Sequence, residues 1–304
     1  MTGINSRVGL CCGVQMISGG CILPSEFSKI KIYGSTAMKT RGVTIIKRVR
    51  CNMLKRLYDK SRIWFSVTWI IAYCVLLSLG DSLSGLIGVE KLITLPIGIL
   101  LSVVLLLFFK KNRLFEEYGI CRSRVPARSM LWYLPLLLML SANLWHGVTL
   151  NLDLSEAVLY MLSMLCVGFL EEVIFRGLLF NAMRKDGIKA AIIVSSVTFG
   201  IGHIINLVNG SGAELIPNLL QVVYATSAGF MFVMIYYRTG SLISCILAHG
   251  IFNALSIFAN EGSAGITERV VSAVLLTLIT SSYAVYITVS MKKQNASHSE
   301  RKIY

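Results

Sequence analysis

Residues 157–183 read AVLYMLSMLCVGFLEEVIFRGLLFNAM and decide the class of fold. The stretch is long enough to cross a lipid bilayer as one helix, which takes about 20 apolar residues. It also carries two adjacent glutamates and an arginine, and a charge at mid-bilayer costs roughly 2.5–3.5 kcal/mol on insertion scales. One alternative is that the apolar segment ends near Leu170 and that the charges mark a solvated helix end. The apolar pattern continues through Phe180, however, so the charges need a functional explanation.

The whole chain has the composition of a membrane protein. Of its 304 residues, 55% are hydrophobic and 14% are charged, which argues against a water-soluble globule. Its eight cysteines form no pair of CxxC motifs, and several lie within apolar runs, which excludes a zinc ribbon and a disulfide framework. The net charge of +14 is explained by basic residues that flank membrane spans, so no nucleic-acid partner is expected.

Eight apolar stretches predict an all-α, polytopic membrane protein, with about eight transmembrane helices and an intramembrane catalytic cavity. The expected spans are 63–80, 92–109, 130–147, 157–183, 190–207, 217–237, 241–259 and 270–290. Lys and Arg gather before the first span and after the second, fourth, sixth and eighth, whereas Asp and Glu dominate the other loops. Excess Lys and Arg marks the cytoplasmic side, so both termini are expected in the cytoplasm and the protein in the plasma membrane.

Three regions are expected along the chain. Residues 1–62 form a basic N-terminal segment without an apolar run of signal-peptide length. This segment is a disordered arm, a regulatory segment or an upstream extension, with Met38 or Met53 as the true start. Residues 63–290 form the transmembrane bundle, and residues 291–304 form a polar tail. The segments between spans are too short for a soluble domain, so any activity is expected in or beside the bilayer.

Polar side chains inside the fourth expected span form the first part of a candidate site. Glu172 and Arg176 are four residues apart, so they share a helix face and are expected to pair. Glu171 points about 100° away on the same helix, so it is not expected to take part in this pair and is available for another role. The pair is therefore expected to hold the helix and the local electric field in place.

Two later spans carry the remaining polar groups. Phe199 and His203 lie in the fifth span, and His249 and Asn253 lie four residues apart in the seventh. Counted inward from the basic loops at ~1.5 Å per residue, Glu171, His203 and His249 reach a similar depth. One histidine in a span is explained by helix packing, but a glutamate, two histidines and an amide at one level indicate a site.

This set of groups favours hydrolysis without a covalent nucleophile. Glu171 is expected to act as general base on a water, assisted by His203. His249 and Asn253 are expected to donate hydrogen bonds to the oxyanion of a tetrahedral intermediate. No HExxH motif and no aspartate pair lies in a span, so no cofactor is expected. Zinc stays open as an alternative, with Glu171, His203 and His249 as its ligands.

Three motifs carry a resemblance to a known family: Glu171-Glu172-x-x-x-Arg176, Phe199-x-x-x-His203 and His249-x-x-x-Asn253. In this order, over about residues 130–260, they resemble the CPBP family of type 2 CAAX prenyl proteases and bacteriocin-processing proteins, also called the Abi family. The resemblance implies an intramembrane glutamic endopeptidase. It assigns water activation to the positions of Glu171 and His203 and the oxyanion hole to those of His249 and Asn253. It does not imply that substrates are prenylated.

The expected substrate is a hydrophobic or membrane-proximal peptide, cut near the cytoplasmic face. Two other functions stay open. The chain is alternatively a non-catalytic immunity or binding protein of the same fold, or a proton-coupled transporter with a relay of Glu and His. A transporter would be favoured by an inverted repeat, and none is evident. The oligomeric state is left open.

Overall fold

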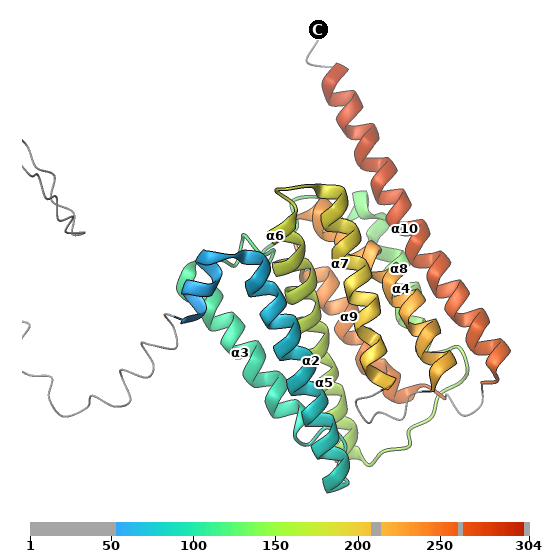
Figure 1. Cartoon of the computed structure of the whole chain (residues 1–304). Helices are drawn as coiled ribbons and strands as arrows, with labels where there is room; N and C mark the ends of the chain where they lie inside the picture. Colours follow the sequence, from blue (N-terminus) through green and yellow to red (C-terminus); the bar gives the residue numbers. More distant parts are fainter. Residues whose placement is uncertain (1–52, 208–213, 261–263, 301–304) are drawn as a thin grey trace, which may run out of the picture. The chain divides into compact units, whose positions relative to one another are not determined.

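The structure is a computed structural model that describes residues 53–207, 214–260 and 264–300, with side chains through residue 294. All named elements of this part of the chain are helical (Figure 1), which confirms the expected all-α membrane fold. The expected N-terminal segment 1–62 lies outside the described residues except for 53–62, where a short helix over 53–60 leads into the first long helix.

Six helices of the described part are long and apolar enough to cross a membrane. They are α2 (Arg62–Ile87), α3 (Thr94–Asn112), α5 (Leu154–Glu171) with its continuations η4 (Glu172–Phe180) and α6 (Asn181–Met183), α7 (Ile188–Gly202) with η5 (His203–Leu207), α8 (Leu215–Thr239) and α10 (Ile266–Glu300). Each corresponds to one expected span. Helix α10 continues beyond residue 290, where a polar tail was expected, to Glu300.

The other two expected spans are shorter or broken. The seventh corresponds to α9 (Ile243–Leu255) and η6 (Ser256–Phe258), a short apolar helix. The third is divided among η2 (Ala127–Tyr133), α4 (Leu134–Leu140) and η3 (Ser141–Leu144). The expected eight continuous spans are therefore corrected, within the described residues, to six spans and two shorter apolar segments.

The break in the third expected span has a local cause. Leu131, Trp132 and Tyr133 adopt left-handed backbone angles, with φ of 49°, 52° and 59°, which ordinary side chains rarely tolerate. Pro135 follows in the first turn of α4. Because proline has no N–H to bond to the preceding turn, a helix starts at it more readily than it runs through it. The hydropathy pattern misses this break because residues 130–140 form a hydrophobic run through it, in which Pro135 is the only exception.

The helices pack side by side in two groups that share the candidate site. Helix α8 packs against α7 and α10, whereas α5 packs against α3 and α9 (Figure 1). Helix α2 contacts both α3 and η4. Element η4 also contacts α7, α8 and α9. It is therefore the segment around which the two groups meet.

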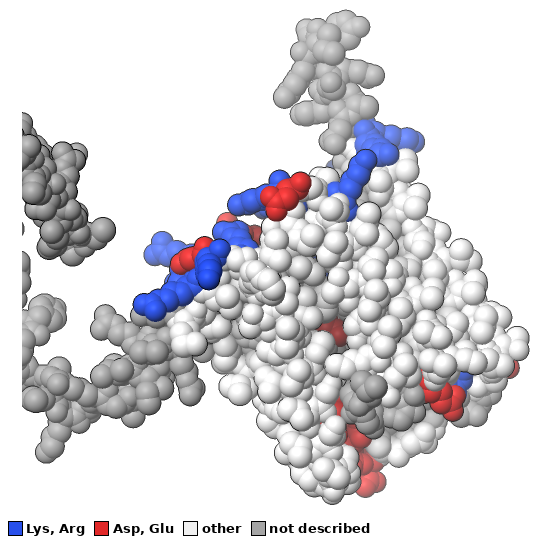
Figure 2. Space-filling view, in the orientation of Figure 1, with Lys and Arg blue, Asp and Glu red and all other residues white. Residues whose placement is uncertain are grey.

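The charges divide between the two ends of the bundle. We call one end the basic end, which holds loops 113–126 and 184–187 and the C-terminal part of α10. The acidic end holds loops 88–93 and 145–153 together with Glu214 and Asn260. Figure 2 shows most of the Lys and Arg side chains along the basic end, above a wide belt that is uncharged except for a small recessed acidic patch. The belt has the composition that contact with lipid requires.

A cluster at the basic end ties the helix over 53–60 to the loop after α3. The Tyr118 hydroxyl donates to the Tyr58 hydroxyl at 2.8 Å, and Arg62 pairs with Glu117. Burial raises the pKa of Tyr58, and burial together with the bond to Tyr58 raises that of Tyr118 well above its usual value. Both phenols are therefore neutral and hydrogen-bonded at neutral pH.

Two glycines allow the site-bearing helices to approach closely. A Cβ atom at Gly168 of α5 would lie 2.5 Å from the Cα of Gly250 in α9. A Cβ atom at Gly200 of α7 would lie 2.8 Å from the Cα of Thr226 in α8. Small residues at such crossings are the usual means of close helix packing in membranes. They set the spacing between the helices that carry the polar motifs.

Candidate active site

The adjacent glutamates lie where α5 changes from α-helical to π-helical geometry. Element η4 is a π-helix of nine residues, all of them buried. A π-helical turn widens the helix and is frequent at functional sites. Glu171 is 8% exposed, and Glu172 and Arg176 are 0% exposed. The charges therefore lie inside the bundle and not at a solvated helix end.

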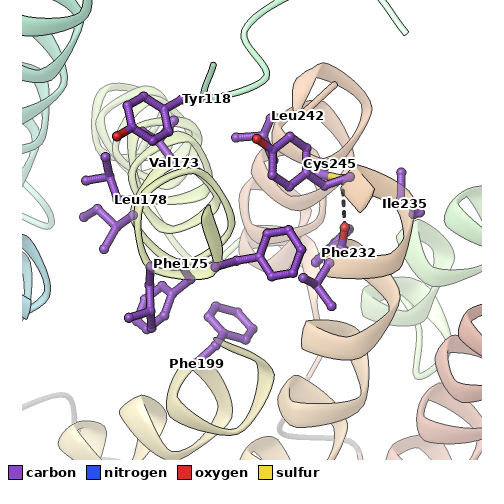
Figure 3. Packing of buried hydrophobic residues seen from close by; sticks show 14 of the residues in the cluster. Tyr118, Val173, Phe175, Leu178, Phe199, Phe232, Ile235, Leu242 and Cys245 are labelled. Atoms are coloured by element: carbon purple, nitrogen blue, oxygen red, sulfur yellow. Dashed lines mark hydrogen bonds between the residues drawn. The ribbon is translucent and has the colours of Figure 1, made fainter. Parts of the chain in front are cut away.

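Glu172 and Arg176 form a buried ion pair. Arg176 Nη1 lies 3.0 Å from Glu172 Oε1. The guanidinium also lies over the ring of Phe199, 4.0 Å from its centroid, and 5.4 Å from the centroid of Phe232. Figure 3 shows Phe199 pointing from α7 toward the side chains of η4. It also shows the hydrogen bond that the Cys245 thiol donates to the backbone carbonyl of Phe232. A carboxylate and two aromatic faces thus hold the arginine in the apolar core.

His249 lies between the two glutamates. Its Nδ1 is 2.8 Å from Glu172 Oε1, and its Nε2 is 3.3 Å from Glu171 Oε2. Because an ionised carboxylate only accepts hydrogen bonds, Nδ1 is the protonated nitrogen in the contact with Glu172. The ring also stacks on Phe232, with centroids 5.4 Å apart. Glu172 therefore orients the imidazole as well as pairing with the arginine, a contact that the sequence reasoning did not foresee.

Tyr73 is a further member of the site that sequence reasoning missed. This half-buried residue of α2 donates its hydroxyl to Glu171 Oε1 at 2.7 Å. In the sequence it is one aromatic residue in an apolar run, 98 positions from its partner. No local pattern connects the two residues. Only the packing of α2 against η4 brings them together.

His203 and Asn253 meet His249 in a small cavity. The cavity has a volume of about 50 Å³, and all three side chains line it. His203 begins η5 at the end of α7, and its Nδ1 lies 3.1 Å from the Phe199 carbonyl oxygen. Glu171 is not among the described residues that line the cavity and meets this group through His249. The structure thus gathers the polar side chains of three expected spans around His249.

A larger cavity adjoins the small one at the acidic end. Its volume is about 490 Å³, and its lining includes Asn143, His146, Glu214 and Asn260. Four side chains line both cavities: Gln221, Tyr224, Phe252 and Leu276. The candidate site is therefore next to a partly polar chamber on the side away from the basic loops.

The side chains named as alternative zinc ligands contact other protein atoms in this arrangement. Among the described residues, no group of three or more His, Cys, Asp or Glu is placed to hold a metal ion. Both ring nitrogens of His249 face glutamates, and His203 Nδ1 faces a backbone carbonyl. Three of the ligand nitrogens are therefore directed at protein atoms.

A known protein family matches the part of the chain that carries these residues. Residues 153–255, about a third of the sequence, match the family described as Type II CAAX prenyl endopeptidase Rce1-like. This confirms the resemblance to the CAAX protease family over the segment from α5 to α9, and it indicates a peptidase in general. No curated protein matches the chain. Tyr73 lies outside the matched segment.

Proposed function

We propose that the protein is an intramembrane endopeptidase in which Glu171 activates water for attack on a peptide bond. One observation carries the proposal: Glu171 contacts His249, which lines the same small cavity as His203 and Asn253. The family match over residues 153–255 supports a peptidase. The buried position of these groups supports catalysis inside the bilayer.

The two oxygens of Glu171 have different surroundings. Oε1 accepts the hydroxyl of Tyr73 at 2.7 Å. Within the described residues Oε2 has no hydrogen-bond partner and lies 3.3 Å from His249 Nε2. Oε2 is therefore the oxygen that takes the proton of the attacking water. Tyr73 holds the other oxygen and so fixes the orientation of the carboxylate.

His249 and Asn253 are placed to stabilise the negative charge that develops on the substrate. Glu172 holds the Nδ1 side of His249. His249 Nε2 faces Glu171 Oε2 in the free protein. In the proposed reaction an N–H at Nε2 donates to the oxyanion instead, and Asn253 presents an amide to the same cavity. His203 shares the cavity and assists in positioning the water.

The reaction balances without a further reactant. The water oxygen bonds to the carbonyl carbon while one water proton passes to Glu171. The tetrahedral intermediate then breaks its C–N bond, and the proton on Glu171 passes to the leaving amine. The products are a carboxyl terminus and a new amino terminus, so one carboxylate serves first as base and then as acid.

The proposed substrate is a hydrophobic or membrane-proximal peptide, and no cofactor takes part. We assign the basic end to the cytoplasm because excess Lys and Arg marks that side. The larger cavity lies at the acidic end and shares four lining residues with the small cavity. We therefore expect the peptide to reach the site from the acidic end and not from the cytoplasmic face that the loop charges suggested.

The test is cleavage of a library of hydrophobic reporter peptides by the purified full-length protein in detergent. Wild type is compared with Glu171→Gln, His249→Ala and the control Glu116→Gln, each with and without a strong chelator. Glu116 is an exposed acid of the loop after α3. The same carboxyl-to-amide change there should leave cleavage unchanged.

The proposal predicts that both site variants lose at least a hundredfold in kcat/KM while the control and the chelator have no effect. Cleavage that the chelator abolishes and zinc restores would replace the glutamate mechanism with a metal mechanism. Cleavage that survives Glu171→Gln would remove this residue as the base. Peptide binding by wild type without any cleaved product would favour a binding or immunity protein.

A further inference from the structure

A separate cleft lies between α7, α8 and α10, three helices that stand side by side in Figure 1. Its volume is about 580 Å³. None of the described residues that line it also lines the two cavities of the candidate site. The cleft is thus a feature of the bundle that the proposed peptidase chemistry does not use.

The walls of the cleft are apolar along the length of the helices. They include Ile192 of α7, Phe230 and Met234 of α8, and Ala284 and Val285 of α10. Val285 is 61% exposed on the surface of a helix long enough to cross the membrane. In a bilayer such a surface faces acyl chains, because no other apolar partner covers it within the described residues.

One end of the cleft carries two positive charges from different helices. Lys189 of α7 and Lys292 of α10 line it, and both are exposed at the basic end. No described carboxylate forms an ion pair with either lysine. The adjoining loop holds Arg184, Lys185 and Asp186, so its net charge is also positive. An apolar groove that ends in unpaired cations has the charge pattern of an amphipathic, anionic ligand.

We propose that this cleft binds an anionic glycerophospholipid. One acyl chain lies along the apolar walls, and the phosphate headgroup contacts Lys189 and Lys292. Basic pockets between transmembrane helices on the cytoplasmic side bind anionic headgroups in this way. The lysine stems lie against the apolar rim while their ammonium groups reach the headgroup level. A zwitterionic lipid has no net charge to balance the two lysines, so the site discriminates by headgroup.

The headgroup is tested by titrating the full-length protein in nanodiscs of phosphatidylcholine with phosphatidylglycerol and counting bound lipids by native mass spectrometry. The variant is Lys189→Gln/Lys292→Gln. The matched control is Lys110→Gln/Lys111→Gln, two exposed lysines at the end of α3 that do not line the cleft. Both double variants remove the same charge from the basic end.

The proposal predicts a roughly fivefold loss in phosphatidylglycerol affinity for each cleft lysine, about thirtyfold for the pair, and little change in the control. Equal losses in the two double variants would show a diffuse effect of surface charge and would overturn the site. Equal retention of phosphatidylcholine and phosphatidylglycerol by wild type would overturn it as well.

The acyl chain is tested by filling the cleft without changing charge. Val285→Trp places a large side chain on a wall of the cleft. Val274→Trp makes the same change on the lipid-facing side of α10 at a residue that does not line the cleft. Lipid retention should fall in the first variant and persist in the second. Unchanged retention in Val285→Trp would place the lipid elsewhere, whatever the peptidase activity proves to be.

Discussion

Arg176 is completely buried, and its guanidinium faces one carboxylate and two aromatic rings. Its removal would leave Glu172 in the apolar core without its cationic partner. We expect Arg176→Met to lower the free energy of unfolding by about 3–5 kcal/mol, the usual effect of breaking a buried pair. The measurement is the unfolding curve in mixed detergent micelles.

The control is an exposed pair with the same spacing. Lys55 and Asp59 are four residues apart with nitrogen and oxygen at 2.6 Å, but their side chains are 43% and 55% exposed. Lys55→Met should therefore change stability by no more than about 1 kcal/mol. The double variant Glu172→Gln/Arg176→Met should be more stable than Arg176→Met alone. An equal loss in both would contradict a role for the uncompensated charge.

Tyr73 tests the orientation of the proposed base. Tyr73→Phe removes only the hydroxyl that donates to Glu171 Oε1. A hydrogen bond to a charged group contributes about 1.5–3 kcal/mol, so kcat should fall roughly tenfold to hundredfold. KM should stay the same, because Tyr73 is not among the described residues lining either cavity. The measurement is steady-state kinetics on a cleaved reporter peptide.

Tyr283→Phe is the matched control for this prediction. The Tyr283 hydroxyl donates to the backbone carbonyl of Met130 at 2.6 Å, in a buried position away from Glu171. Its removal should lower stability and leave kcat per folded molecule unchanged. If both variants lose kcat to the same extent, Tyr73 has only a structural role.

Among the elements, the crossing of α5 and α9 determines whether His249 reaches the glutamates. A methyl group at Gly168 would overlap the backbone at Gly250. We expect Gly168→Ala to separate the helices, to cost about 1–3 kcal/mol of stability and to abolish peptidase activity. Gly85→Ala in α2 is the control, since no atom lies within 4 Å of a Cβ there. Thermal unfolding and cleavage assays compare the two variants.

A different result would show that another feature positions the glutamates. If Gly168→Ala kept full activity, the spacing between α5 and α9 would not control the site. Element η4 would then be the feature that positions Glu171 and Glu172. Because Gly168→Ala and Gly85→Ala add the same methyl group to a helix, any difference between them reports the contact between α5 and α9.

At the scale of the whole molecule, we expect the two ends of the bundle to lie on opposite sides of the membrane, so that only one of them is accessible to reagents outside the cell. In a cysteine-free background, Lys111→Cys at the basic end should react with a membrane-impermeant thiol reagent only after the cells are opened. Asn260→Cys, in the lining of the larger cavity, should react in intact cells. A bulky reagent at position 260 should also block cleavage, whereas the same reagent at position 111 should not. The reverse labelling pattern would contradict the assigned orientation.

Part of the site could be predicted from sequence because its geometry is local. The contact between Glu172 and Arg176 follows from helical spacing of four residues, and the structure contains it. Counting residues along apolar helices predicts a similar depth for Glu171, His203 and His249. In the structure His203 and His249 line one cavity, and Glu171 contacts His249. The contacts of His249 with both glutamates are different, because they depend on how closely α9 approaches α5.

The amino-acid sequence by itself determined the helical class, the membrane environment, the alternation of charge between loops and the polar motifs within three apolar helices. These properties follow from hydrophobicity and from helical periodicity, which act over a few neighbouring residues. Only the tertiary structure decided the break before Pro135, the bond from Tyr73 to Glu171, the orientation of His249 and the two-lysine cleft. Each of these depends on side chains far apart in the chain or on backbone angles that hydropathy does not record. Packing between helices therefore brings the side chains of the separate motifs into contact and forms the site.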